Sequence, residues 1–189
     1  MYKLDIWGQD YEIDTSMIIS GDKFSAFLKK CFDNADLFSF NEAIWTNCSC
    51  KDMQKELEPF LTKEIQVQKW FGYDYSMAPE MDRRTIRVYL YQADSAAKDI
   101  ILKYCSDVFL RQNIGGEFMD PVQTLEDLCF FSDGKLFVGT VSHEFLLKVE
   151  PPSKDFEDSM KKLGRWKYTN QLPPIGADNS TLYFCKLDI

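Results

Sequence analysis

His143 is the only histidine in the chain, and Glu144 follows it directly. An imidazole changes its charge near neutral pH, so it suits general acid–base catalysis and pH sensing. A neighbouring carboxylate can share the proton of such a ring or orient it. We therefore take His143 and Glu144 as the candidate acid–base residues. The plainer alternative is a histidine near the end of a strand that forms only local hydrogen bonds.

The one local cluster of basic residues consists of Arg83, Arg84 and Arg87, with Tyr89 and Tyr91 close behind them. Guanidinium groups bind phosphates and carboxylates through paired hydrogen bonds, and they stack on aromatic rings. Arg84 and Arg87 are therefore candidate anion-binding residues. An ordinary exposed strand face that carries arginine and tyrosine is the plainer interpretation.

Six cysteines are spread along the chain: Cys31, Cys48, Cys50, Cys105, Cys129 and Cys185. Most of them stand in apolar patterns, as free cysteines in a reducing compartment do. Cys48 and Cys50 form a CxC pair, but no second pair and no nearby histidine completes a metal site. The sequence therefore predicts neither a metal centre nor another cofactor.

Acidic side chains gather at Asp155, Glu157 and Asp158. Paired carboxylates at a fixed separation serve glycosidases and metal-dependent nucleases, but spacing in the sequence does not show that these groups converge. As a solvated helix face they need no further explanation. Among functional roles, contact with a basic protein partner fits them best.

Two aromatic segments are the other candidates for partner binding. The first contains Trp70, Tyr73 and Tyr75, and the second contains Trp166 and Tyr168. Tryptophan and tyrosine are enriched at binding hot spots because they offer a large rigid contact area with a polar tip. The alternative is packing at the edge of the core.

Composition narrows the class of protein. The 189 residues include 15 Phe, 9 Tyr and 4 Trp, which is typical of a well-packed globule, and the net charge of −8 argues against binding nucleic-acid phosphates. The first residues lack the basic and apolar regions of a signal peptide, and no apolar run has the length of a membrane span. We expect a cytoplasmic protein that does not bind a membrane.

The elements around His143 centre on a hairpin over Leu128–Val149. Asp133 and Gly134 predict a type I′ turn, which places Cys129 opposite Val138 and Phe131 opposite Leu136. Neither face of this hairpin is polar, so it should lie inside a sheet that is covered on both sides. Strand alternation puts His143 on the face opposite to Cys129, which argues against a Cys–His dyad.

Apolar spacing predicts the remaining elements. Helices are expected at about 21–33, 51–60, 95–109 and 154–163, with caps at Asp22, Asp94 and Ser153. Strands are expected at about 2–7, 11–13, 37–40, 64–73, 84–91 and 181–187, and a helix stop is expected at 113–116. The whole chain, 1–189, therefore predicts a single α+β domain, in which about four helices cover a mixed, largely antiparallel sheet.

The hairpin residues SDGKLFVGTVSHE, within an acidic and aromatic-rich α+β chain, resemble small immunity proteins of bacterial toxin systems. The resemblance covers about a tenth of the chain and implies a non-catalytic bacterial protein that neutralises a toxin by direct binding. The competing hypothesis is an enzyme or ligand-binding domain, with its site around His143 and the cluster of Arg83, Arg84 and Arg87. Neither hypothesis fixes the oligomeric state.

Overall fold

The computed structural model describes residues 1–8, 13–42, 49–75, 85–114, 117–121 and 123–169. Four helices lie in it: α1 (Gly21–Phe32), α2 (Asp52–Leu57), α3 (Ser95–Tyr104) and α4 (Lys154–Met160). Three short 3-10 helices accompany them: η1 (Thr15–Met17), η2 (Glu58–Phe60) and η4 (Ser142–Glu144). No described helix combines the length and the apolar character needed to cross a membrane.

Eight strands form one antiparallel sheet, in the order β12-β1-β11-β10-β9-β2-β6-β3. They are β1 (Tyr2–Leu4), β2 (Leu37–Glu42), β3 (Leu61–Val67), β6 (Ile86–Gln92), β9 (Leu125–Ser132), β10 (Lys135–Val141), β11 (Leu146–Val149) and β12 (Trp166–Tyr168). Two small pairs complete the fold: β4 (Lys69–Trp70) with β5 (Tyr73–Asp74), and β7 (Arg111–Ile114) with β8 (Glu117–Pro121). The α+β class and the four covering helices that the sequence predicted are confirmed.

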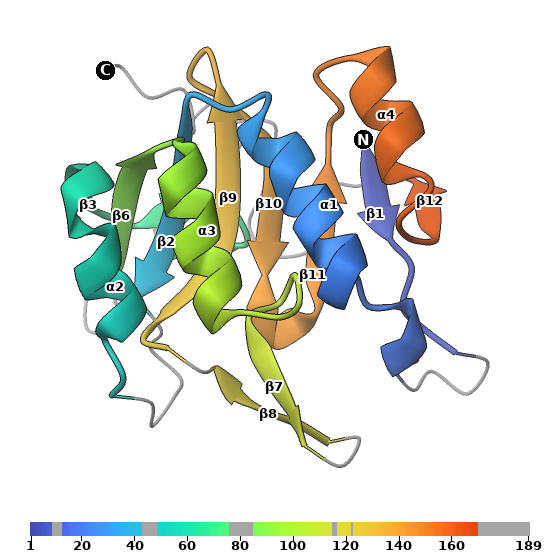
Figure 1. The fold of residues 1–189 in the computed structure, drawn as a ribbon, viewed down its shortest axis with the longest axis horizontal. Helices are drawn as coiled ribbons and strands as arrows, with labels where there is room; N and C mark the ends of the chain where they lie inside the picture. Colours follow the sequence, from blue (N-terminus) through green and yellow to red (C-terminus); the bar gives the residue numbers. More distant parts are fainter. Residues whose placement is uncertain (9–12, 43–48, 76–84, 115–116, 122, 170–189) are drawn as a thin grey trace.

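All four helices cover the same face of the sheet (Figure 1). α1 turns Phe24, Phe27, Leu28 and Cys31 inward, which is the stripe that its spacing predicted. Asp94 and Ser153 cap α3 and α4 with their side chains, as expected, because each accepts a hydrogen bond from an amide in the first turn. The cap predicted at Asp22 was wrong: Ser20 occupies the N-cap position, and Asp22 lies in the first turn.

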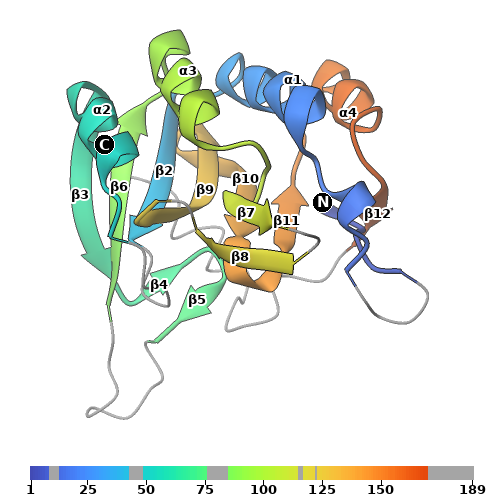
Figure 2. The same ribbon diagram turned by 60° about the horizontal axis from the view of Figure 1, so that its bottom comes forward.

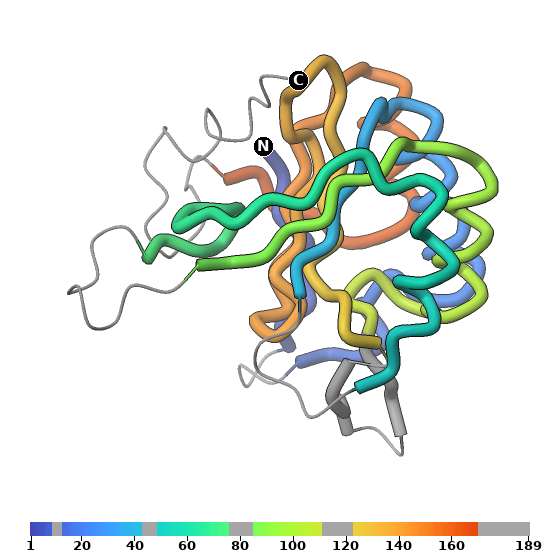
Figure 3. The backbone as a smooth tube through the Cα atoms, turned by 90° about the vertical axis from the view of Figure 1, so that its left-hand side faces the viewer, coloured from blue at the N-terminus to red at the C-terminus, as the bar shows by residue number. Residues whose placement is uncertain are grey.

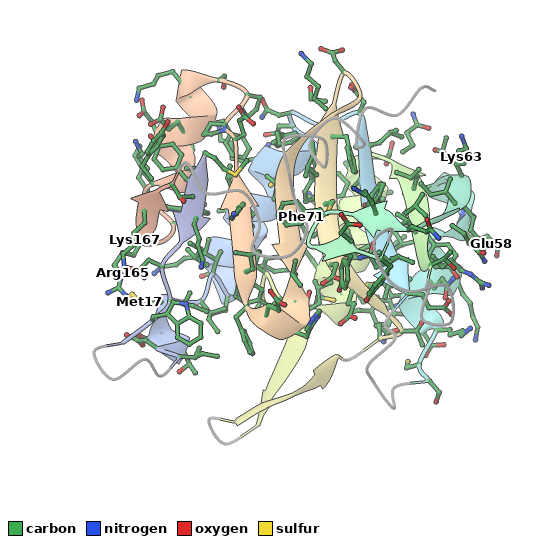
Figure 4. The ribbon with its side chains drawn as sticks, turned by 180° about the vertical axis from the view of Figure 1, so that it is seen from behind. Met17, Glu58, Lys63, Phe71, Arg165 and Lys167 are labelled. Atoms are coloured by element: carbon green, nitrogen blue, oxygen red, sulfur yellow. The ribbon has the colours of Figure 1, made fainter. Side chains whose placement is uncertain are left out.

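The β4–β5 pair covers the opposite face (Figures 2 and 3). Phe71, in its turn, lies over the middle of this face (Figure 4). A second apolar cluster forms here, separate from the core beneath the helices, and includes Trp70, Phe71, Val88, Phe131 and Val141. The central strands are therefore buried on both faces, which confirms the expectation drawn from the two apolar faces of the hairpin.

The hairpin between β9 and β10 has the predicted turn, since Asp133 and Gly134 both have positive φ, 49° and 69°. Phe131 pairs with Leu136 as expected, but the next pair is Phe130 with Val138. Phe137 is therefore an extra residue, a β-bulge.

The bulge changes the register that alternation predicted. Cys129 lies opposite Gly139, not opposite Val138. Val138 joins the core under the helices, whereas Val141 packs in the cluster behind the sheet. One extra residue moves each later side chain of the strand to the opposite face of the sheet.

Other boundaries differ from the pattern in the sequence. α3 ends at Tyr104, and residues 111–114 form a strand where a helix stop was expected. His143 lies in η4 and not in a strand, so strand alternation does not apply to it. The strands predicted at 11–13 and 181–187 fall wholly or mainly outside the described residues.

Candidate functional site

His143 is partly exposed in η4, in the connection between β10 and β11. Its Nδ1 atom lies 3.5 Å from the hydroxyl oxygen of Tyr73, and the centroids of the two rings are 5.9 Å apart. Glu144 is also partly exposed in η4, and within the described part of the chain no hydrogen bond joins its carboxylate to the imidazole. The described partner of the imidazole is therefore a tyrosine and not the adjacent carboxylate.

Asp127 is the centre of the polar contacts beside His143. It is fully buried in β9, at a second bulge, where Asp127 and Leu128 together stand opposite Phe40. Its φ is 59°, in the left-handed region, which Asp tolerates better than most residues. The bulge turns its side chain toward Ser142: the Ser142 amide donates to Asp127 Oδ1 at 2.6 Å, and the Asp127 amide donates to Ser142 Oγ at 3.2 Å.

Two further groups donate to the other oxygen of the Asp127 carboxyl group. The Tyr73 hydroxyl donates to Oδ2, and Nδ2 of Asn41 donates to it at 3.0 Å. Burial raises the pKa of Asp127, and the hydrogen bonds from Ser142, Tyr73 and Asn41 oppose that rise. The carboxyl group is thus held by three donors from three separate segments.

Tyr73 reaches this carboxyl group because the β4–β5 turn fits closely on β10. A Cβ atom at Gly139 would lie 2.7 Å from the Phe71 ring, and one at Gly72, whose φ is 83°, would lie 2.2 Å from Val141. Glycine is required at both positions for the β4–β5 turn to lie this close to strand β10. Burial, together with the nearby Asp127 charge, raises the pKa of the Tyr73 hydroxyl, so it stays a donor.

Glu126 completes a set of donors that could hold a metal ion. One ligand atom each from Glu126, Asp127 and His143 lies within 4.8 Å of the others, and Glu126 is also buried. The sequence predicted no metal site, because these residues do not form a recognised motif. The CxC pair does not contribute to this set: Cys50 accepts a hydrogen bond from Gln123, and Cys48 lies outside the described residues.

The predicted anion-binding residues are not part of this centre as far as the structure describes them. Arg87 Nε lies 3.3 Å from a Glu64 oxygen and 3.6 Å from a Glu42 oxygen. A hydrogen bond with Tyr89 and these two carboxylates raise the pKa of Arg87. An anion at Arg87 would compete with these carboxylates, whereas Arg83 and Arg84 lie outside the described residues.

A second candidate site brings together most of the predicted partner-binding residues. We call it the α4–β12 surface, and it consists of Asp155, Glu157, Asp158, Trp166 and Tyr168. Trp166 Nε1 donates to the carbonyl oxygen of Met160 at 2.9 Å, which ties β12 to the end of α4. Tyr2 links the two elements from β1: its hydroxyl donates to Glu157 Oε1 at 2.5 Å, and its ring meets that of Tyr168 edge-on at 5.6 Å.

Lysines of the chain itself pair with the acidic groups of this surface. Lys30 lies 2.9 Å from Asp155, Lys154 contacts Asp158 at 3.0 Å, and both Lys154 and Lys161 contact Glu157. The local charge is therefore largely balanced. A basic partner would have to displace these lysines, which reduces the advantage expected from acidity alone.

The other predicted aromatic residues lie on the far side of the sheet and are largely covered. Trp70 and Tyr73 are buried in the cluster beneath the β4–β5 turn, and Tyr75 is partly buried against it. Trp70 and Tyr73 are therefore core residues, which is the alternative to partner binding that the sequence left open. Tyr168, by contrast, is 67% exposed.

Sequence reasoning missed Asp127, Asn41, Ser142 and Glu126. A signal was present, since Glu126 and Asp127 interrupt an apolar run that a buried strand requires, and buried carboxylates need partners. Searches of protein-family models, of curated proteins and of solved structures return no match for the chain.

Proposed function

We propose that this chain acts by binding another protein, without catalysis, and that the α4–β12 surface is its docking site. The observation that carries the proposal is Tyr168, an exposed aromatic side chain on the outermost strand of the sheet. The ring of Tyr2 holds it from one side. An aromatic side chain that is already ordered before binding loses little conformational entropy on contact with a partner.

One further exposed apolar side chain lies on the same edge of the sheet as Tyr168. Of the described residues, Trp7, Leu61 and Tyr168 are the exposed large apolar side chains. Trp7 belongs to the same edge of the sheet, since Arg165, directly before β12, donates to the Trp7 carbonyl oxygen at 2.9 Å. Leu61 lies on β3, at the opposite edge.

The paired charges of α4 lie to one side of Tyr168, because Tyr2 contacts both Glu157 and the Tyr168 ring. Protein interfaces commonly combine an aromatic centre with polar groups around it. We propose further, from the resemblance of the hairpin residues, that the partner is a bacterial toxin, which the chain neutralises in the cytoplasm. The net charge of −8 supports a basic partner through long-range attraction.

A comparative capture experiment tests the proposal. The tagged chain is used as bait in a lysate of the source organism that contains the expressed toxin candidates, beside Tyr168→Ala and Leu61→Ala baits. We expect one stoichiometric partner with the native chain and with Leu61→Ala, and at least about tenfold less with Tyr168→Ala. Equal capture by all three baits would refute the α4–β12 surface as the docking site.

The contact between His143 and Tyr73 favours a second candidate function, a ligand-binding or catalytic domain with His143 at its centre. Tyr73, in turn, donates its one hydroxyl proton to Asp127, so its oxygen would accept from Nδ1–H of His143, and three titratable groups stand in sequence. His143→Gln would abolish an activity of this kind while it leaves the melting temperature nearly unchanged. A large fall in melting temperature would instead identify His143 as structural.

A further inference from the structure

Three donor atoms converge at the buried end of β9. The ligand atoms of Glu126, Asp127 and His143 lie within 4.8 Å of one another. Donors that share one transition metal are about 3 to 4 Å apart, since each bond is about 2.0–2.2 Å long. The three side chains would therefore need to approach by about 1 to 2 Å to share one cation.

Asn41 supplies an independent sign of a missing partner. The residue is only 2% exposed, and its Oδ1 atom has no hydrogen-bond partner among the described residues. The other end of the same amide donates to Asp127, and the register of β2 and β9 sets Asn41 opposite Glu126. The unsatisfied oxygen therefore belongs to an amide that lies against the donor set.

The charge balance around Asp127 also favours a bound cation. Asp127 is a fully buried carboxyl group, and burial of an ionised carboxylate is costly unless an opposite charge or hydrogen bonds offset it. The groups that donate to Asp127 are Tyr73, Asn41 and Ser142, all neutral, and no described lysine or arginine pairs with Asp127. A divalent cation would offset the negative charge and also satisfy Oδ1 of Asn41.

The surrounding hydrogen bonds suit a ligand carboxylate. Side chains that bind metals are commonly oriented by a second set of donors, which fixes their geometry. Ser142 and Tyr73 perform this role for Asp127, one on each oxygen.

We propose that Glu126, Asp127 and His143 bind a divalent transition-metal cation, with Oδ1 of Asn41 as a fourth donor. Two carboxylates, an imidazole and an amide oxygen suit Mn²⁺ or Zn²⁺. The cation joins strand β2, the bulge of β9 and η4, and so stabilises this end of the sheet. This site does not depend on protein binding at the α4–β12 surface.

Mn²⁺ is the preferred probe, because the six cysteines of the chain would compete for Zn²⁺. Mn²⁺ is added to the metal-free full-length chain, and thermal unfolding is recorded. Saturation at about a hundred times the dissociation constant should raise the melting temperature by about 5 °C or more. The chain has a single histidine, so paramagnetic Mn²⁺ should also broaden its one set of imidazole NMR signals.

Two variants and a matched control assign the site. Glu126→Gln removes one charge, and His143→Phe keeps a planar ring beside Tyr73 but removes both nitrogens. Each should weaken Mn²⁺ binding at least about tenfold. Glu144→Gln makes the same chemical change as Glu126→Gln one residue beyond His143 and should leave the affinity unchanged.

Two results would overturn the site. One is a native chain that shows neither the thermal shift nor the broadening. The other is an unchanged affinity in His143→Phe, whose partly exposed position makes it the variant more certain to fold. Equal losses in Glu126→Gln and Glu144→Gln would show diffuse attraction to acidic groups and would count against the site as well.

Discussion

The hydroxyl of Tyr73 donates a hydrogen bond to the buried carboxyl group of Asp127, which lies 54 residues further along the chain. The bond joins the β4–β5 turn to the bulge of β9, and its other side faces His143. The bond therefore connects the β4–β5 pair, which covers one face of the sheet, to the polar residues around Asp127.

Tyr73→Phe should lower the free energy of unfolding by about 1–3 kcal/mol, because it leaves a buried acceptor with one donor fewer. The pKa of Asp127 should rise further, since the bond from Tyr73 lowers it. Urea unfolding measures the first effect, and NMR titration of the carboxyl group measures the second. Tyr168→Phe is the control, because its ring is exposed, and a loss as large in that variant would contradict the account.

Gly139→Ala should destabilise the chain by about 1–3 kcal/mol, as overpacking in a filled core does. The new methyl group would meet the Phe71 ring at 2.7 Å and lift the β4–β5 turn. Phe71→Leu should relieve part of this cost, so that urea unfolding of the double variant shows a favourable coupling energy. Strict additivity of the two substitutions would mean that the glycine and the ring do not constrain each other.

Glu157 should make stability depend on pH at the acidic end. Hydrogen bonds from Lys161 and then Tyr2 lower the pKa of Glu157 to about 2 in the folded chain, below its ordinary value of 4.5. The unfolded chain therefore binds the proton first, and the stabilisation by Glu157 is fully present above about pH 4.5 and is lost as the pH falls toward 2. The melting temperatures of the native chain and Glu157→Gln should thus converge between pH 4.5 and 2, and a constant difference over this range would contradict the assignment.

Lys154→Gln tests whether the partner is basic. Lys154 pairs with both Glu157 and Asp158, so its loss removes the lysine partner of Asp158, whereas Glu157 keeps Lys161. Capture of a basic partner should strengthen about two- to fivefold at low salt, with a steeper salt dependence. Lys55→Gln is the matched control, because Lys55 forms a similar exposed pair with Asp52 on α2. Unchanged capture by Lys154→Gln would exclude attraction by this acidic face.

The sequence predicted elements that depend on local chemistry. The stripe of α1 follows from helical spacing, and the turn at Asp133 follows from residues that accept positive φ. Cys31 and Cys105 are free and buried cysteines, as their apolar settings indicated. Each of these inferences needs only a few neighbouring residues.

The polar centre could not be predicted in the same way. The bulge at Phe137 changes the register without a local signal, and His143 leaves the strand pattern altogether. Tyr73, Asn41 and Asp127 meet only because β2, β9 and the β4–β5 turn come together in space. Such convergence depends on the whole topology and not on spacing in the sequence.

A photo-crosslinking amino acid at position 168 shows whether the partner docks on the α4–β12 surface. A benzophenone side chain replaces Tyr168 in one variant of the full chain and Leu61, at the opposite edge of the sheet, in another, and both variants are expressed in the source organism. Irradiation should join position 168, but not position 61, to one protein partner. Adducts of equal yield at both positions, or adducts at position 61 alone, would contradict a docking site on the α4–β12 surface.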